Sequence, residues 1–161
     1  MSHLIVYRHF SSKFDLYVGV LERATEQLAR ELAVPGAIGT YGPTPAALLA
    51  AARVDETGFR ILWRHATREP DFTSWVDAAR SVVDARTRAA LAPIVAPEHR
   101  EWAARATSAY VIEAVLHWIE YGDPRLDARF VAATDAALGA GVRSWARAPR
   151  NSRPPAPEKK S

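Results

Sequence analysis

The chain has 161 residues, 48% of them hydrophobic, so it can bury the core of one domain and is too apolar to be disordered throughout. It has no cysteine, which excludes disulfides, thiolate metal sites and cysteine nucleophiles. The formal net charge of +3 comes from the tail after Arg147, which holds four basic residues and one acidic residue, so the remainder is neutral. Only a local basic cluster could therefore argue for nucleic-acid binding.

The sequence shows no segment that would place it in a membrane or direct its export. No apolar run reaches the roughly 18 residues that a membrane-spanning helix needs. The apolar stretch before Tyr7 is too short for a signal peptide. Together with the lack of cysteine, this leads us to expect a cytoplasmic protein without membrane contact.

The first predicted element is a short helix from Ser2 to about His9. A turn follows, and Lys13 then begins a long helix, whose free backbone N–H groups favour an anion. The side chains of Tyr7, Arg8, His9 and Lys13 gather several hydrogen-bond donors near this helix start, which suits phosphate binding. A solvated basic helix end would show the same pattern.

The pattern after this segment continues to predict helices. A long amphipathic helix begins at a capping box, Ser12–Asp15, and reaches about Ala33, with apolar residues at steps of three and four. Two prolines and three glycines in residues 34–43 predict a break. Thr44 and Pro45 then supply a cap and a first-turn proline, so another helix begins there.

Two helices are predicted between residues 44 and 91. The first runs to about Pro70 with one apolar face. The second covers about Thr73 to Leu91, with Asp84 and Arg88 as an i,i+4 ion pair. The residues predicted to point inward are Phe59, Leu62, Trp63 and Ala66 in the first helix and Trp75, Val76, Ala79, Val82 and Val83 in the second.

The last two predicted helices, about 98–121 and 124–147, are joined by so short a turn that they must be antiparallel neighbours. Residues 109–119 are apolar nearly all round, which predicts burial on more than one face. Alanine and glycine keep the final helix thin, so another helix can approach closely. Because so small a chain has little else to cover this pair, we favour a homodimer through both helices over a monomeric core. Residues 148–161 are proline-rich and predicted to be a disordered tail.

Aromatic residues gather in the middle of the chain, where they fit either an ordinary core or the lining of an apolar small-molecule pocket. Glu113 is the one carboxylate inside an apolar run, so it needs a hydrogen-bond or charge partner, supplied by a pocket or by a dimer interface. The residues expected to line a ligand pocket are Phe59, Trp63, Trp75, Tyr110 and Glu113.

The sequence contains no pattern typical of a catalytic or metal site. It has no Gly-x-Ser-x-Gly, no glycine-rich phosphate loop and no His-Glu-x-x-His. Glu113, His117 and Glu120 follow one another on a helix, but their spacing differs from the Glu-x-x-His of di-iron bundles. We therefore expect no catalysis, no metal and no other cofactor.

Residues 2–16 read Ser-His-Leu-Ile-Val-Tyr-Arg-His-Phe-Ser-Ser-Lys-Phe-Asp-Leu. This stretch resembles the recognition helix of TetR-type transcriptional regulators, which reads approximately Gly-Val-Ser-x-x-x-Leu-Tyr-x-His-Phe-x-x-Lys-x-x-Leu. Val6 replaces the usual leucine. A looser similarity to effector-domain helices of the family covers residues 58–72 and 102–124. The residues that match the recognition-helix pattern are Ser2, Tyr7, His9, Phe10, Lys13 and Leu16.

This resemblance implies an all-α fold, with a partial helix-turn-helix (the recognition helix only) followed by a TetR-type effector and dimerisation bundle. It divides the chain into a remnant of the DNA-binding domain, 1–33, a ligand-binding and dimerisation domain, 44–147, and the tail, 148–161. It also implies DNA contacts: phosphates would meet Tyr7, His9 and Lys13, and base edges would meet Ser2, His3 and Leu4.

The two helices that precede the recognition helix in this family have no counterpart in the printed sequence. We expect either a start codon assigned too far downstream or a truncated gene, because Met1 stands where the family has valine and GTG encodes valine within a gene but can initiate translation. Translating the upstream DNA in frame distinguishes the two. A chain that truly begins at Met1 is expected to bind an operator weakly or not at all.

Three functions follow from these patterns. The favoured one is a ligand-responsive repressor that a small apolar or amphipathic molecule releases from DNA. The second is a helical dimerisation or ligand-binding module without specific DNA binding. A helical enzyme comes last, because the sequence assembles no catalytic site.

Overall fold

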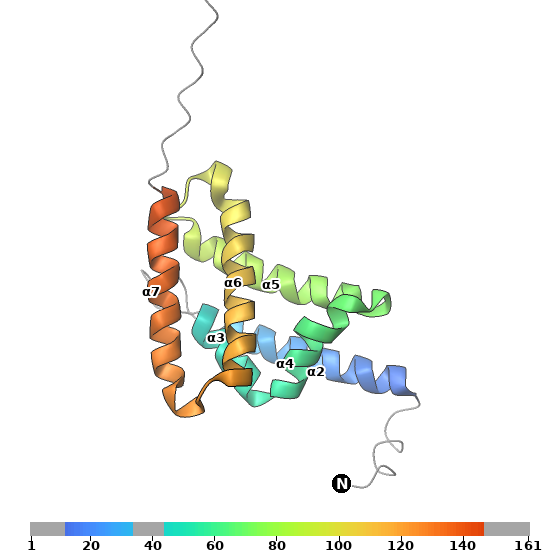
Figure 1. Cartoon of the computed structure of the whole chain (residues 1–161). Coiled ribbons are helices and arrows are strands. Elements are labelled where there is room, and N and C mark those ends of the chain that lie inside the picture. The colour runs from blue at the N-terminus through green and yellow to red at the C-terminus, as the bar shows by residue number, and fades with distance from the viewer. Residues whose placement is uncertain (1–11, 34–43, 147–161) are drawn as a thin grey trace, which may run out of the picture.

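The computed structural model of the chain describes residues 12–33 and 44–146, which are helical nearly throughout (Figure 1). No strand occurs among them, which confirms the all-α fold class. The short helix expected at 2–9, the break at 34–43 and the tail at 148–161 lie outside these residues. The α-helices, labelled as in Figure 1, are α2 (Lys13–Ala33), α3 (Thr44–Val54), α4 (Glu56–Arg60), α5 (Thr73–Leu91), α6 (Arg100–Tyr121) and α7 (Asp127–Ala146), with a π-helical segment (Ile61–His65) and 3-10 turns at Ala66–Arg68, Pro70–Phe72, Pro97–His99 and Pro124–Leu126.

Helix α2 begins at the predicted cap, because the backbone N–H of Asp15 donates to Ser12 Oγ at 3.0 Å. Its apolar stripe packs against α3 and α5. Leu21 and Leu28 on this stripe are fully buried, whereas Phe14 in the first turn is 50% exposed. The beginning of α2 therefore extends beyond the core.

The prediction of one continuous helix from residue 44 to about residue 70 is wrong, although its inward face is right. Asp55 interrupts the helix, because its carboxylate accepts a hydrogen bond from the backbone N–H of Gly58 at 2.8 Å and so caps α4. A Cβ at Gly58 would collide with this carboxylate. The π-helical segment then widens the next turn. The predicted inward residues are nevertheless all buried: Phe59, Leu62, Trp63 and Ala66.

Helix α5 has the predicted bounds and packs most extensively against α6. Two predictions about its surface are wrong. Val82 is 39% exposed, because its neighbour Val83 takes the position that faces the core. Arg88 pairs with Glu101 of α6 at 2.8 Å rather than with Asp84, because Asp84 lies on the buried side of the helix.

Helices α6 and α7 form the antiparallel hairpin that their short turn predicts. Both cross the directions of α2 and α5 at a steep angle (Figure 1). At the turn end of this hairpin, Arg53 of α3 donates two hydrogen bonds of 2.9 Å to the Asp127 carboxylate. Trp118 Nε1 donates to the same carboxylate at 2.6 Å, and its ring stacks on Phe130 with centroids 4.7 Å apart. This end is therefore tied to the rest of the bundle by polar and aromatic contacts.

The opposite end, here called the open end, has a small core of its own. The rings of Trp102 and Trp145 meet there with centroids 4.9 Å apart. Burial of α6 on more than one face is not observed within the single chain, since Tyr110 is 47% exposed. The buried residues of the small core are Leu91, Val95, Ala103, Ala104 and Val142.

Candidate functional site

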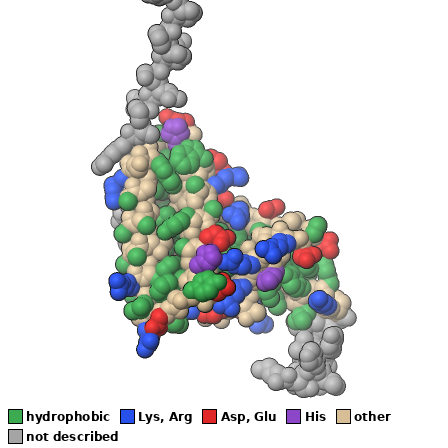
Figure 2. Space-filling view, viewed as in Figure 1, with side chains coloured by type: hydrophobic (Ala, Val, Ile, Leu, Met, Phe, Trp, Pro, Cys, Tyr) green, Lys and Arg blue, Asp and Glu red, His purple; other side chains and the backbone are tan. Residues whose placement is uncertain are grey.

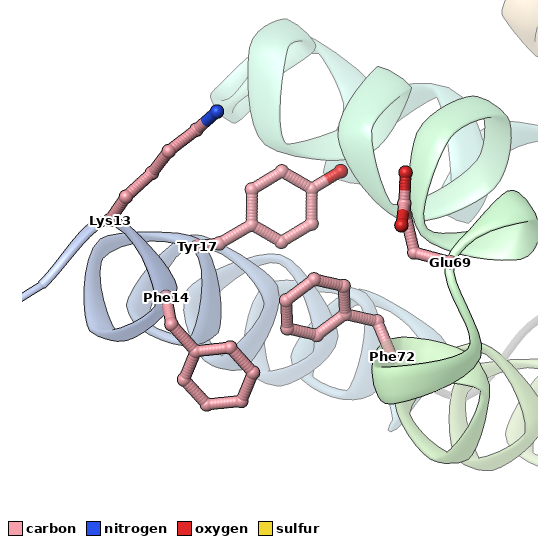
Figure 3. A pocket seen from close by; sticks show the side chains of 5 residues that line it. All are labelled: Lys13, Phe14, Tyr17, Glu69 and Phe72. Carbon is pink, nitrogen blue, oxygen red and sulfur yellow. The ribbon is translucent and has the colours of Figure 1, made fainter.

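Of the residues expected to contact DNA, the structure describes only Lys13. It is the first residue of α2 and is exposed. Its side chain stands at the rim of a cleft between the beginning of α2 and the turns that lead into α5 (Figure 3). The other expected DNA contacts lie outside the described residues: Ser2, His3, Leu4, Tyr7 and His9.

This aromatic cleft, of about 300 Å³, is lined by Lys13, Phe14, Tyr17, Glu69 and Phe72. The Phe14 and Phe72 rings stack with centroids 5.2 Å apart, and the Tyr17 and Phe72 rings lie 4.5 Å apart. Figure 3 shows the Tyr17 hydroxyl directed toward the side of the cleft that carries Glu69, with the Lys13 ammonium on the opposite side. The cleft therefore has an aromatic floor and opposite charges at its two sides.

Two features of the cleft act on the Tyr17 hydroxyl, its partial burial and the nearby Glu69 carboxylate. Partial burial raises the pKa of the Tyr17 hydroxyl, and the negative charge of Glu69 raises it further. The hydroxyl therefore remains protonated near neutral pH. The negative potential of Glu69 also reaches the aromatic floor, which favours a cationic group there.

Three of the five residues expected to bind a ligand belong to the core. Phe59 and Trp63 are buried side by side with ring centroids 6.3 Å apart, and Arg80 lies 5.5 Å above the Trp63 ring. Trp75 packs against the same cluster, half-buried. The Trp63 Nε1 atom is buried and donates no hydrogen bond to any residue that the structure describes, which is uncommon for an indole N–H in a protein interior.

The other two expected ligand residues, Tyr110 and Glu113, lie on the outer face of α6. Glu113 has the partners that the sequence requires, since its carboxylate lies 3.9 Å from both Arg64 Nη2 and His117 Nε2. Both Glu113 and His117 are more than half exposed. The structure therefore separates this pair of residues from the Phe59–Trp63 cluster instead of bringing all five together.

Tyr110 lines a second depression, of about 260 Å³, between α6 and α7. Figure 2 shows hydrophobic side chains spread over this part of the hairpin. Trp102, on the same outer face of α6, is 45% exposed. The residues of this hairpin groove are Ala106, Thr107, Tyr110, Ala137, Leu138, Gly141 and Trp145.

The sequence patterns do not reveal the aromatic cleft or the hairpin groove as such. Phe72 and Glu69 stand at the end of a predicted helix, where periodicity carries no information about distant neighbours. The cleft forms only because the turns after the π-helical segment bring Phe72 onto Phe14. The alanines and glycines of α7 do signal a close approach of another helix, but they do not show which side of α7 stays open.

The described residues hold no cluster of three or more His, Asp or Glu side chains that could bind a metal ion. None of the helices in residues 12–33 and 44–146 is both long and apolar enough to cross a membrane. Comparison of the chain with models of protein families, with curated proteins and with solved structures found no match.

Proposed function

We propose that the chain is a TetR-type transcriptional regulator, a homodimeric, ligand-responsive repressor that contacts DNA through residues 2–13 and has no catalytic activity. The resemblance of residues 2–16 to a recognition helix supports the DNA contact. One structural observation supports the homodimer: the α6–α7 hairpin presents an apolar face that the described residues leave exposed.

The outer face of the hairpin fits a second copy of the same chain. Two large aromatic side chains, Trp102 and Tyr110, are nearly half exposed on it. The neighbouring face of α7 is smooth, because its exposed positions include Ala132, Ala133, Ala136, Ala137 and Ala140. Extended apolar surfaces of this kind mark interaction sites. A two-fold axis would pair this face with itself, which suits a regulator that reads two half-sites of an operator.

Sedimentation velocity tests the dimer directly. The wild-type chain is expected to sediment as a dimer at micromolar concentration. Ala137→Glu would place a carboxylate in the hairpin groove and is expected to yield monomers. Ala85→Glu, at an exposed position of α5, is the matched control and should leave the dimer intact. A wild-type chain that sediments as a monomer would contradict the proposed dimer.

DNA binding is tested with the protein produced from its natural gene. The purified protein is mixed with a pool of random DNA duplexes, and the duplexes that it binds are selected and sequenced. The selected sequence is expected to have two-fold symmetry. Lys13→Ala should weaken binding to all sequences alike. It should also reduce the slope of the logarithm of the binding constant against the logarithm of the salt concentration by about one per protomer, as loss of a phosphate contact does. Arg23→Ala, also exposed on α2, is the control. Equal affinity for selected and scrambled duplexes would favour the module without specific DNA binding.

The buried Trp63 N–H supports a ligand site in the core, because a ligand oxygen would supply the missing acceptor. Apolar or amphipathic compounds that bind the folded chain are expected to raise its melting temperature. Trp63→Phe should abolish this shift for compounds with a carbonyl group, whereas Trp75→Phe should preserve it. Equal shifts in both variants would place the ligand elsewhere.

A further inference from the structure

We infer that the aromatic cleft binds a small amphipathic organic cation. Its ammonium group lies between the Glu69 carboxylate and the Tyr17 hydroxyl, and its apolar body covers the exposed Phe14 ring. The residues assigned to this site all belong to the described part of the chain. The site is separate from the ligand site proposed in the core around Trp63, and it does not depend on the proposed DNA binding. The exposed rings, the charge of Glu69 and the size of the cleft support it.

The floor of the cleft offers aromatic surface to a ligand. Phe14 is 50% exposed, whereas Leu21 and Leu28 on the apolar stripe of the same helix are fully buried. Phe14 and Tyr17 both pack against Phe72, so the three rings form one continuous surface. Aromatic rings gathered in this way attract a cation through their negative faces and bury the apolar part of the same ligand.

The charges of the cleft determine where the ammonium group lies. The Glu69 side chain forms no ion pair and no hydrogen bond with the residues that the structure describes. Burial raises the pKa of the Tyr17 hydroxyl and the charge of Glu69 raises it further, which shows that the carboxylate acts on this hydroxyl. An ammonium group placed between them donates hydrogen bonds to both oxygens. The Lys13 ammonium, on the opposite side of the cleft, directs a cation toward Glu69 (Figure 3).

The size of the cleft and its rings narrow the chemical class of the ligand. A volume of about 300 Å³ lies at the lower end of the range for small-molecule pockets. One ring with a short charged chain fits this space. An anion paired with Lys13 would meet the negative faces of the three rings, so the aromatic floor favours a cation over an anion.

Nuclear magnetic resonance tests the site with 2-phenylethylammonium, which joins one ring to one ammonium group. Its neutral counterpart, 2-phenylethanol, is the control ligand. The cation is expected to bind with a dissociation constant of about 1 mM, roughly fivefold tighter than the alcohol. Its largest effects on backbone amide shifts should fall on Tyr17, Glu69 and Phe72. Equal affinities for the two ligands, no saturation by the cation, or shifts centred on Trp63 or Tyr110 would each overturn the inference.

A charge-removing variant tests the role of the carboxylate. Glu69→Gln keeps the shape of the side chain and is expected to weaken binding of 2-phenylethylammonium about fivefold, with no change for 2-phenylethanol. Glu22→Gln, at an exposed position of α2, is the matched control and should affect neither ligand. If Glu69→Gln bound the cation as tightly as the wild type does, the carboxylate would not hold the ammonium group.

A ring-removing variant tests the aromatic floor. Phe14→Ala is expected to weaken binding of both ligands several-fold, because both place their ring on this surface. Phe14 is half exposed, so the fold should survive the change, as circular dichroism can verify. Tyr121→Ala removes a ring that is 78% exposed at the end of α6 and is the control. Unchanged affinities in Phe14→Ala would overturn the placement of the ligand on the floor.

Discussion

The two ends of the α6–α7 hairpin are held in different ways. At the turn end, the Asp127 carboxylate joins Arg53 of α3 and Trp118 of α6, and the Trp118 and Phe130 rings stack. At the open end, apolar residues form a small separate core beside the Trp102–Trp145 pair, and Arg100 donates hydrogen bonds to the backbone carbonyls of Ala92 and Val95. Both ends expose an aromatic side chain, Tyr121 at the turn end and Trp102 at the open end, but only the turn end is organised around a single carboxylate.

The contrast predicts which end of the hairpin is more sensitive to what binds next to it. An end fixed by directional hydrogen bonds keeps its geometry whether or not a partner binds. The open end has a separate apolar core and depends more on what covers it, because the burial of apolar surface contributes to its stability. The following predictions test this difference, from the largest expected effect to the smallest.

Leu91→Ala should have the largest effect, because Leu91 is fully buried in the small core of the open end. The cavity is expected to cost about 2–5 kcal/mol in the free energy of unfolding. Hydrogen exchange should accelerate first at the open end, while the amides around Asp127 keep their protection. Leu126→Ala, at an exposed position in the turn, is the control. Uniform acceleration along both helices would show that the two ends are not independent.

Asp127→Ala should loosen the turn end. The change removes the acceptor of two Arg53 bonds and of the Trp118 N–H, at a cost of about 1–3 kcal/mol for a partly exposed, charged hydrogen-bond network. Urea unfolding measures the loss. Asp77→Ala, which removes a carboxylate at an exposed position of α5, is the control and is expected to change little. Equal losses in the two variants would refute the special role of Asp127.

The pH dependence of stability should reflect the same hydrogen bonds to the Asp127 carboxylate. The hydrogen bonds from Arg53 lower the pKa of Asp127, burial opposes this shift, and the Trp118 N–H adds to it. A lowered pKa in the folded state adds stability above the ordinary carboxyl pKa of 3.8, and this contribution is lost as pH falls through the folded pKa. Asp127→Asn should therefore flatten the acid limb of a plot of unfolding free energy against pH.

Asp135, also on α7, provides the opposite case. Burial raises its pKa, so its ionisation costs stability as pH rises above the ordinary carboxyl value. Asp135→Asn should accordingly make the chain more stable at pH 7 than the wild type. A loss of stability at pH 7 would mean that the Asp135 carboxylate has a structural role in its ionised form.

Gly141→Ala should have the smallest effect on the isolated chain. A Cβ at Gly141 meets no atom of the described part of the chain within 4 Å, so the higher helix propensity of alanine should add up to about 1 kcal/mol. Gly141 lines the hairpin groove, so the same methyl group would hinder a second copy. We expect a higher melting temperature at submicromolar concentration and a weaker dimer by sedimentation. An unchanged dimer affinity would show that Gly141 lies outside the interface.

The local elements of the fold were accessible from the sequence. The stripe of apolar residues and the Ser12 cap locate α2, and α5 begins and ends at the predicted residues, Thr73 and Leu91. The break at Asp55 was missed, because the periodicity continues through it and aspartate is tolerated inside helices. Its side chain caps the Gly58 N–H here, a choice that depends on how α3 and α4 pack.

The candidate sites were far less accessible. Lys13 and Tyr110 both line clefts, but sequence reasoning grouped Tyr110 with core residues such as Phe59 that the structure keeps apart from it. Residues that share a chemical character need not share a cavity. The face that each helix buries decides which of them meet.

The sequence by itself determined the helical class of the described residues, the bounds of α2 and α5 and the antiparallel hairpin, because caps, periodicity and short turns act over a few residues. Only the tertiary structure decided that Arg53 meets Asp127, 74 residues away, and that Phe72 covers Phe14. Such contacts depend on helix packing angles, which no local pattern encodes. The same packing forms the hairpin groove and the aromatic cleft from residues that are far apart in the sequence.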